Sequence, residues 1–459
     1  MIRYTLSYAL LLAALVSPSL ASFSVSNPET RELSAPASND QLGAASAASD
    51  HYYAISAPGR STNGVVLVYN HHTGDLLYTL SSEFSQSGVL LDASMAISDQ
   101  YLAVGLPSLI NGQGAVLVWD LTDGSLYHTF THSSPNDGDH FGASLALSGN
   151  HLLVGAPEDE PDSTGALTQN FGSATLFDLS STSPLHHFTA SSPNNEDSYG
   201  FSVALSTDYL VIGCPGYDIP SGGGDEGAVF TYSPTSYSSL NTISIEASNA
   251  QAALGYQVDI KDGAMIASAY QGFSTDNKCY LFDLSSGAVL STFASPSSTS
   301  INTFGYRIAI DNTIAIGDRF ANNSIGQVYL YDLQGNYLRT IENPSSNSGD
   351  QFSASLAYAS QSLFLGAPGY DTESFFNTGI TYIYQVNERI NLSISRDLST
   401  LTLTWDSIPG VSYNILSTQN IDQSSWATVN DIPITASSSS TNYQVPLSLS
   451  KQFFTISTN

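Results

Sequence analysis

Apolar and small residues alternate along most of the chain, in short runs that end at glycine, asparagine or aspartate. The stretch "DHFGASLALSGNHLLVGAP", residues 139–157, is typical: Phe141, Leu145 and Leu147 are separated by small residues, and Pro157 ends the run. This period of two indicates β-strands, and small residues in place of charged ones indicate strands that are buried on both faces. Helical periodicity is absent. The pattern therefore predicts an all-β protein.

The same passage recurs seven times along the chain. Successive copies start 48 to 58 residues apart, at Leu42, Leu91, Phe141, Tyr199, Leu254, Phe304 and Phe352. Each copy runs 14 residues, or 13 in the sixth, to the position that Gly155 occupies in "GAP". A variable loop follows, then a third strand such as "GAVLVWD" from Gly114 and a fourth such as "DGSLYHTF" from Asp123. Four short strands joined by turns predict one propeller blade, so seven copies predict seven blades.

The two ends of the repeat region complement each other. The seventh copy lacks a fourth strand after "GITYIYQ" from Gly379, whereas "TRELSAPASNDQLG" from Thr30 matches the end of a blade and precedes the first copy. We therefore expect the N-terminal segment to supply the missing outer strand and to close the ring. The predicted fold is an all-β, seven-bladed propeller closed by an N-terminal strand, with a small C-terminal β-sandwich.

These phased repeats resemble FG-GAP repeats, as in the propeller that heads integrin α-subunits and in many secreted bacterial proteins. The resemblance covers residues 30–387 and implies structural roles for Phe141, Gly142, Gly155, Pro157, Tyr199, Gly200, Gly213, Phe304, Gly305, Gly366 and Pro368. In integrins several blades bind calcium in D-x-D-x-D-G loops between the first and second strands. Here the equivalent turns, such as "SGN" at 148–150 and "KDG" at 261–263, are too short to surround the ion. The integrin calcium sites are therefore not carried over to this chain.

The two ends of the chain differ from the repeats. Residues 1–21 combine Arg3, an apolar run and a small residue at the expected cleavage point, Ala21, which predicts a secretory signal peptide. The propeller is expected over residues 22–387. Residues 388–459 contain "LTLTWDSIPGVSYNILSTQNIDQSSW", which resembles a short fibronectin-III-like β-sandwich with Trp405 in its core and a less certain place for Trp426. Because a signal peptide is predicted and no later apolar run approaches the length of a membrane span, we expect a protein that is secreted or at the cell surface. We expect it to be monomeric.

The charge balance excludes one class of partner. The chain has 11 Lys and Arg against 40 Asp and Glu, for a net charge of −29, and no Lys or Arg lies between Arg60 and Lys261. DNA, RNA and acidic polysaccharides are bound by basic patches, so such partners are disfavoured and no nucleic-acid partner is expected. Solubility in salty surroundings is the simpler explanation of the acidity. Cation binding by some of the carboxylates is the alternative.

The uneven loops define a candidate binding face. In an up-and-down meander, the loops from second to third strands and the connections between blades emerge on one face, which we call the long-loop face. Loops that vary on a constant scaffold commonly carry recognition. The candidates there are Glu158, Asp159, Asp162, Asp197, Tyr217, Asp218, Asp225, Glu226, Tyr370, Asp371, Phe375 and Phe376. Solvated acidic loops are the simpler reading of the acids, and a Ca²⁺ site is the alternative, with the metal itself unknown.

Three further residue patterns are given structural interpretations. Aspartates that precede the repeat starts by two residues, Asp40, Asp139, Asp197 and Asp350, are expected to cap turns. Cys214 and Cys279 are interpreted as separately buried thiols, with a disulfide left open. The pairs His71-His72 and His186-His187 lack the spacing of a metal motif, so an outer-edge role is expected.

Together these observations favour a non-catalytic recognition or adhesion protein that binds an extracellular protein or glycan through the long-loop face. The alternative is an extracellular polysaccharide-degrading enzyme, a glycosidase or lyase, using carboxylates of the same face. A purely structural envelope component is a third possibility. The chain has no G-x-S-x-G, H-E-x-x-H or P-loop motif, and no catalytic residue is assigned.

Overall fold

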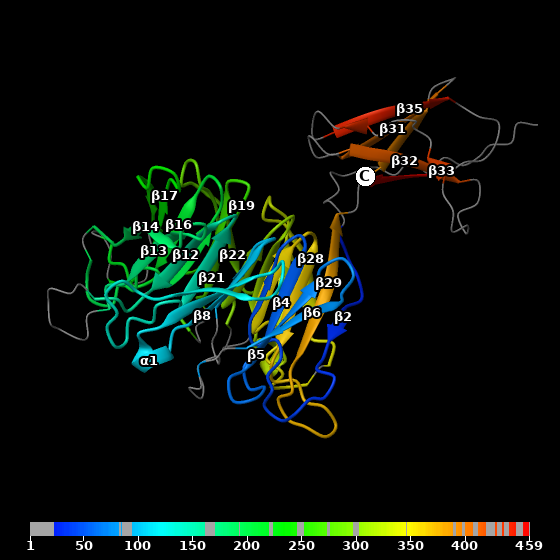
Figure 1. Cartoon of the computed structure of the whole chain (residues 1–459). Helices are drawn as coiled ribbons and strands as arrows, with labels where there is room; N and C mark the ends of the chain where they lie inside the picture. The colour runs from blue at the N-terminus through cyan, green and yellow to red at the C-terminus, as the bar shows by residue number, and fades with distance from the viewer. Residues whose placement is uncertain are drawn as a thin grey trace, which may run out of the picture. The chain divides into compact units, whose positions relative to one another are not determined.

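A ring of antiparallel sheets dominates the computed structural model (Figure 1). The structure describes residues 23–81, 84, 94–160, 170–191, 193–219, 224–245, 252–272, 276–296, 303–345 and 347–388, and seven strands after them. Contacts divide the chain into the compact unit Val25–Val386, which is the propeller, and a second unit that includes Asn387–Asn459. The expected signal peptide and Asp162 lie outside the described residues.

Six blades are four-stranded antiparallel sheets whose strands follow chain order. Blade 1 consists of β3 (Ser46–Ala48), β4 (Tyr52–Ala57), β5 (Val65–Asn70) and β6 (Leu76–Leu80). Blade 2 consists of β7 (Met95–Ile97), β8 (Tyr101–Leu106), β9 (Ala115–Asp120) and β10 (Leu126–Phe130). Blade 3 consists of β11 (Ser144–Ser148), β12 (His151–Ala156), β13 (Ser173–Asp178) and β14 (Ser183–Phe188). Blade 4 consists of β15 (Ser202–Leu205), β16 (Leu210–Cys214), β17 (Ala228–Tyr232) and β18 (Ser239–Ile243). Blade 5 consists of β19 (Leu254–Lys261), β20 (Ala264–Ala269), β21 (Lys278–Asp283) and β22 (Val289–Ala294). Blade 6 consists of β23 (Arg307–Ile310), β24 (Ile314–Asp318), β25 (Gln327–Tyr331) and β26 (Tyr337–Glu342).

The seventh blade is closed by the N-terminal segment, as the sequence predicts. Its own strands are β27 (Ser355–Ala359), β28 (Ser362–Ala367) and β29 (Ile380–Glu388). β2 (Glu29–Arg31) pairs antiparallel with β29 from Glu29↔Ile383 to Arg31↔Thr381, and β1 (Phe23–Val25) also joins β29. Figure 1 shows this meeting of the chain's early blue strand β2 and late orange strand β29. Pairing the two ends in one sheet leaves no open seam in the ring.

Glycines of neighbouring blades approach each other closely in the ring. A Cβ placed on Gly155 of blade 3 would lie 2.0 Å from the carbonyl oxygen of Gly200 in blade 4. The same approach recurs between Gly366 and the carbonyl of Gly43, where the distance would be 1.9 Å and blade 7 meets blade 1. Only glycine tolerates backbones this close. The recurrent glycines of the repeat therefore set the spacing of the blades.

Serine hydroxyls reinforce the same junctions. Ser144 Oγ donates to the carbonyl of Gly200 at 2.7 Å, and Ser355 Oγ donates to the carbonyl of Gly43 at 2.8 Å. First strands such as β11 border the axial cavity and are mostly half-buried, whereas the second strands are buried on both faces, and β8 is buried along its whole length. This burial explains why the sequence alternates apolar with small residues.

The face opposite the long loops is trimmed to short turns. β11 and β12 are separated by Gly149 and Asn150 alone, and β19 and β20 by Asp262 and Gly263, both with positive φ. Among the residues that the structure describes, helix is limited to two four-residue segments, α1 (Leu109–Gly112) in blade 2 and α2 (Ala321–Ser324) in blade 6. The sequence predicted no helix, and single turns of this length carry no amphipathic period by which to recognise them.

The second unit contains two small sheets among its described strands. One joins β30 (Leu392–Arg396), β31 (Thr400–Asp406) and β35 (Ser440–Pro446), and the other joins β32 (Ser412–Thr418), β33 (Ala427–Thr428), β34 (Ile434–Thr435) and β36 (Phe453–Thr458). Trp405 is 1% exposed, in agreement with its predicted place in a core. Trp426 lies outside the described residues.

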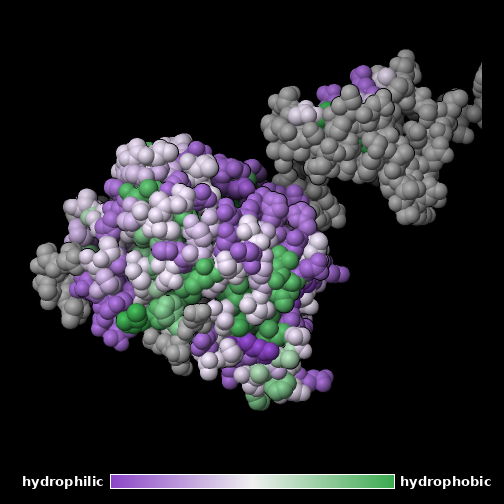
Figure 2. Space-filling model, viewed as in Figure 1, coloured by the Kyte–Doolittle hydropathy of each residue, from purple (hydrophilic) through white to green (hydrophobic). Residues whose placement is uncertain are grey.

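The surface of the propeller mixes polar and apolar residues (Figure 2). Several apolar side chains on fourth strands reach solvent, among them Leu76, Leu126 and Leu290. Among the residues that the structure describes, no helix has the length and apolar character of a membrane span.

Candidate functional site

The long-loop face is set by the direction of the inner strands. The first strand of each blade begins where its second strand ends, as the register Ser144↔Gly155 in blade 3 and Arg307↔Gly317 in blade 6 shows. The blade connections arrive at this edge, and the loops to the third strands leave from it. Side chains just before a first strand and just after a second strand therefore gather on one face.

The acidic candidates of blades 3 and 4 mostly hold their own loops. Glu226 is 1% exposed, and its carboxylate accepts the backbone N–H of Gly224 at 2.9 Å. Asp218 is exposed, and its Oδ1 accepts the N–H of Asp225 at 2.8 Å. Glu158 lies 3.1 Å from Nδ1 of His140. These contacts account for the acids as loop-forming residues.

Three of the four aspartates that precede the repeat starts cap turns, as predicted. In each, one carboxylate oxygen, Oδ2, accepts a hydrogen bond from the backbone N–H of the residue three positions earlier. The donor is Ala37 for Asp40 (2.6 Å), Asn136 for Asp139 (2.6 Å) and Asn194 for Asp197 (2.7 Å). Asp350 differs, because its Oδ2 accepts from the side chains of Asn343 and Ser345. The cap is therefore a repeated structural device.

Two of the capping aspartates carry a perturbed pKa. Burial raises the pKa of Asp197 to about 6, and the charges of Asp218 and Asp225 add to this effect against the hydrogen bond from Asn194. Burial likewise raises the pKa of Asp139 to about 6, with Asp159 adding to the shift. Burial also raises the pKa of Asp225.

The aromatic candidates lie in two separate places. In blade 4, Tyr217 packs edge-on against Phe230 with ring centroids 5.3 Å apart. In blade 7, the loop with Tyr370 and Asp371 presents Phe375 and Phe376, which are 40% and 71% exposed. This second loop binds the connection ahead of blade 1, where the N–H of Asn39 donates to the carbonyl of Phe376 at 2.8 Å. Blades 4 and 7 are not neighbours in the ring, so the candidates do not form one site.

A different group of side chains meets near the propeller axis on the long-loop face. It comes from blades 4, 5 and 6, and we call it the aromatic–arginine cluster: Phe201, Tyr256, Tyr270, Tyr306, Arg307, Arg319 and Phe320. The guanidinium carbon of Arg319 lies 3.9 Å from the ring centroid of Tyr306, and that of Arg307 lies 4.5 Å from the same ring. Arg319 Nε is buried and has no hydrogen-bond partner among the described residues.

The aromatic rings of this cluster touch in sequence around the axis. The ring centroids of Phe201 and Tyr256 are 4.9 Å apart, and those of Tyr256 and Tyr270 are 4.6 Å apart. Burial raises the pKa of Tyr256 to about 12, so its hydroxyl is neutral at physiological pH. Four of the rings thus contact one another in series, and two permanent cations pack on the ring of Tyr306.

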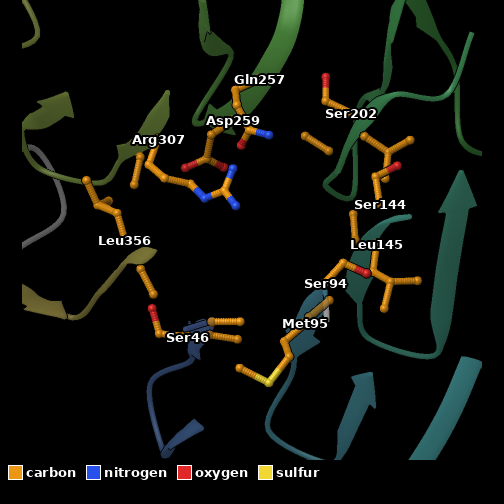
Figure 3. Close-up of a pocket in the computed structure, with 18 of the residues that line it drawn as sticks. Ser46, Ser94, Met95, Ser144, Leu145, Ser202, Gln257, Asp259, Arg307 and Leu356 are labelled. Atoms are coloured by element: carbon orange, nitrogen blue, oxygen red, sulfur yellow. The ribbon is translucent and has the colours of Figure 1, made fainter. Parts of the chain in front are cut away.

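The cluster adjoins a cavity of about 380 Å³ that follows the propeller axis and is lined by the first strands of all seven blades. Figure 3 shows Arg307 and Asp259 side by side in this cavity, with serines such as Ser144 and Ser202 around it. Arg307 and Asp259 are its charged lining residues. Desolvation in the cavity raises the pKa of Asp259 to about 6, against the hydrogen bond from the N–H of Ile310 at 2.9 Å.

The sequence contains a signal for this cluster that the loop-based argument missed. Two residues after each repeat start stands alanine in blades 1, 2, 3 and 7, but an aromatic residue in blades 4, 5 and 6, at Phe201, Tyr256 and Tyr306. Replacement of alanine by an aromatic residue in three consecutive copies indicates a position whose side chain the packing of the blades does not restrict.

A second group lies at the edge of blade 3. His132 comes from the connection into the blade, Asp159 from the loop after β12, and His187 from β14. One nitrogen or oxygen of each lies within 4.8 Å of the other two. Nε2 of His132 is 3.6 Å and Nε2 of His187 is 4.0 Å from Oδ2 of Asp159. Desolvation lowers the pKa of His187 although the nearby Asp159 charge raises it.

The other paired histidines and the two cysteines are held within the propeller. His71 bonds Ser362 at 2.8 Å and thereby links blades 1 and 7, and His186 stacks on Tyr237 with ring centroids 5.0 Å apart. These are structural roles, as expected. His187 departs from the expectation, because its partners come from segments far away in the sequence. Cys214 and Cys279 are separate buried thiols, in agreement with the prediction.

Comparison with known proteins supports the repeat assignment. The FG-GAP repeat family matches residues 128–175 and 184–232, which run from the end of blade 2 to the third strand of blade 4. No curated protein matches the chain. The protein thus contains FG-GAP repeats in a seven-bladed propeller, a fold associated with recognition and adhesion and typical of extracellular proteins.

Proposed function

We propose that this protein is a non-catalytic recognition protein that acts outside the cell and binds a glycan through the aromatic–arginine cluster. The observation that carries the proposal is the stack of Arg319 and Arg307 on Tyr306 at the mouth of the axial cavity. Sites for small ligands are commonly concave and aromatic with a few convergent polar groups. The cluster is aromatic and contains two arginines, and its Phe201 and Arg307 also line the axial cavity.

The chemistry of the cluster suits a sugar. Pyranose rings present C–H faces that pack on aromatic rings, and Tyr306, Tyr256 and Phe201 are partly exposed rings of this kind. An arginine offers five N–H donors in a fixed fork, which suits sugar hydroxyls and carboxylates.

The charge of the protein narrows the ligand further. The chain has only 11 Lys and Arg against 40 Asp and Glu, and the cluster brings two of these arginines together. We propose that they can accept one uronic-acid carboxylate, while the acidity of the whole protein disfavours a long, densely charged polymer. A neutral oligosaccharide and a short uronic-acid oligosaccharide are therefore both tested.

The other parts of the chain are proposed to support this role. Residues 1–21 would direct export and be removed, and the monomeric mature protein would be secreted or lie at the cell surface. Residues 388–459 would form a fibronectin-III-like spacer or attachment module. The long loops of blades 3, 4 and 7, with Tyr217 and Phe375 among their residues, would border the bound glycan.

The experiment is a glycan array probed with the full chain, followed by affinity measurements on the best neutral and uronic-acid oligosaccharides. We expect Tyr306→Ala and Arg319→Ala each to weaken binding by at least tenfold, which is about 1.4 kcal/mol. The matched control is Tyr337→Ala, because this tyrosine is 49% exposed on the outer strand β26. Phe375→Ala tests whether the blade 7 loop takes part.

Three outcomes would contradict the proposal. Binding that survives Tyr306→Ala and Arg319→Ala would place the site elsewhere on the protein. Absence of glycan binding together with capture of a matrix protein would favour a protein partner. Release of reducing ends from the bound oligosaccharide would favour the alternative, an extracellular polysaccharide-degrading enzyme.

A further inference from the structure

We propose that His132, Asp159 and His187 bind a zinc ion at the edge of blade 3. The three side chains come from different segments of the chain, yet the structure brings one ligand atom of each within 4.8 Å of the others. Two imidazole nitrogens and one carboxylate oxygen are a ligand set that zinc uses in proteins. The site is independent of the aromatic–arginine cluster, which lies on blades 4 to 6.

The hydrogen bonds of the two histidines leave the required nitrogens available. Nδ1 of His132 lies 3.0 Å from the carbonyl oxygen of Ser134, and a carbonyl only accepts, so Nδ1 carries the proton. Nδ1 of His187 lies 3.0 Å from the hydroxyl of Thr175. An outer partner on one ring nitrogen fixes the ring and directs the lone pair of the other toward a metal. In both residues that other nitrogen is Nε2, which faces Asp159.

The burial of His132 gives a second, independent indication. The residue is 8% exposed, and its Nε2 has no hydrogen-bond partner among the described residues. A buried polar atom without a partner is costly and calls for an explanation. A cation held between Nε2 of His132 and Oδ2 of Asp159 would satisfy this nitrogen and would also neutralise the carboxylate, which belongs to a residue only 7% exposed.

The spacing is compatible with zinc after a small adjustment. Zinc bonds of about 2.0–2.1 Å in a tetrahedron separate ligand atoms by about 3.3 Å. The two separations from Asp159 Oδ2 are 3.6 and 4.0 Å. Rotations of the Asp159 and His187 side chains can close these gaps, because the His187 side chain is 44% exposed. Calcium fits poorly, since it prefers six or more oxygen ligands.

The site has an open fourth position. A cavity of about 330 Å³ lies beside the three ligands and is also lined by Ser133, Glu160 and Thr189. Water or a ligand group can complete the tetrahedron from this side. Asp139 supports the ligand set from behind, with Oδ2 3.7 Å from Nδ1 of His132. Zinc would therefore tie the connection from blade 2 to both the loop and the outer strand of blade 3.

Zinc titration of the chelator-stripped full chain tests this proposal. We expect one zinc ion per chain with a micromolar or tighter dissociation constant by competition with a chromophoric chelator, and a higher melting temperature with zinc. Co²⁺ should give the intense visible absorption of a four-coordinate site. His187→Gln and Asp159→Asn should weaken zinc binding at least tenfold. His187→Gln is the more informative variant, because its exposed side chain can be replaced without disturbing the fold.

The matched control is His186→Gln, the neighbouring residue on β14, which stacks on Tyr237 and should leave zinc binding unchanged. Fewer than about 0.2 zinc ions per chain, equal affinity of wild type and His187→Gln, or equal affinity for Ca²⁺ and Zn²⁺ would each overturn the proposal. None of these measurements depends on a glycan, so failure of the proposed recognition function leaves the result interpretable.

Discussion

Two groups of blades in the propeller share the same repeat but differ in one side chain that precedes or begins the first strand. In blades 3 and 4 the same aromatic–glycine pair precedes the first strand, Phe141-Gly142 and Tyr199-Gly200, yet the next residue is Ala143 in one and Phe201 in the other. Blades 5 and 6 continue the aromatic series, whereas blades 1, 2 and 7 have alanine at this position. Packing of the blades therefore constrains the glycine of the pair strongly and the residue that follows it weakly.

Distances explain the difference. Gly142 has a φ of +93°, and a Cβ there would lie 2.8 Å from the carbonyl oxygen of Ala115. Ala143 borders the axial cavity, where a larger side chain meets open space. Repetition thus marks the positions that hold the blades together, and departures from repetition mark the positions where a binding site can develop.

The largest expected effect comes from filling a glycine junction. In Gly155→Ala the new Cβ would lie 2.0 Å from the carbonyl oxygen of Gly200 and 2.2 Å from Oγ of Ser144. Neither backbone can move without opening the junction between blades 3 and 4. We expect the free energy of unfolding to fall by about 3 kcal/mol or more in urea denaturation.

The control for this substitution lies on the opposite face. Gly149→Ala also adds a methyl group, but a Cβ there meets nothing within 4 Å. Its φ of +57° costs about 1–2 kcal/mol for an alanine, with no steric clash. A loss in Gly155→Ala no greater than in Gly149→Ala would contradict the role assigned to the junction.

A smaller effect is expected where a shared residue meets a variable loop. Asp40 and Asp197 cap the same turn in blades 1 and 4, but Asp40 pairs with Arg60 at 2.8 Å whereas Asp197 is surrounded by Asp218 and Asp225. With its pKa raised to about 6, Asp197 binds its proton more tightly in the folded state. Its contribution to stability is therefore present below pH 4 and lost as the pH rises through 6.

The substitution Asp197→Asn isolates this contribution. Asparagine keeps an oxygen acceptor for the N–H of Asn194 and removes the titration. Between pH 4.5 and 7.5, we expect the unfolding free energy of the wild type to fall by about 2 kcal/mol more than that of the variant. Asp208→Asn, at an exposed turn on the opposite face, should retain the wild-type slope. Equal slopes for all three proteins would show that Asp197 does not titrate in this range.

The fold was predictable because its determinants repeat. The glycine junctions, the capping aspartates and the spacing of the copies all follow from one blade packing on the next, and the surplus strand at Thr30 matches the vacancy after Gly379. Each of these features depends on contacts within a blade or with the neighbouring blade. Seven copies of the same signal then make the architecture readable from the sequence alone.

The binding sites were less predictable because their residues do not repeat. His132, Asp159 and His187 stand in a connection, a loop and an outer strand, and the paths of these segments fix their separation. The aromatic residues Phe201, Tyr256 and Tyr306 did indicate the aromatic–arginine cluster in the sequence. They lie at the inner strands, however, and loop length indicates only residues of the long loops. The abundant acidic residues of the loops were predicted as candidate ligand contacts instead. Two of them, Glu226 and Asp218, form hydrogen bonds that stabilise their own loops.

The smallest expected effect tests the freedom of the variable position. Ala143→Tyr would give blade 3 the side chain that blades 5 and 6 have at the equivalent place. Because Ala143 borders a cavity of about 380 Å³, we expect the free energy of unfolding to change by less than about 0.5 kcal/mol in urea denaturation. The adjacent substitution Gly142→Ala adds a far smaller group yet should destabilise the protein strongly, since its Cβ meets backbone. If the tyrosine is the more disruptive of the two, then packing around the axis restricts the mouth of the ring as tightly as the junctions, and the aromatic residues of blades 4 to 6 would be part of the scaffold.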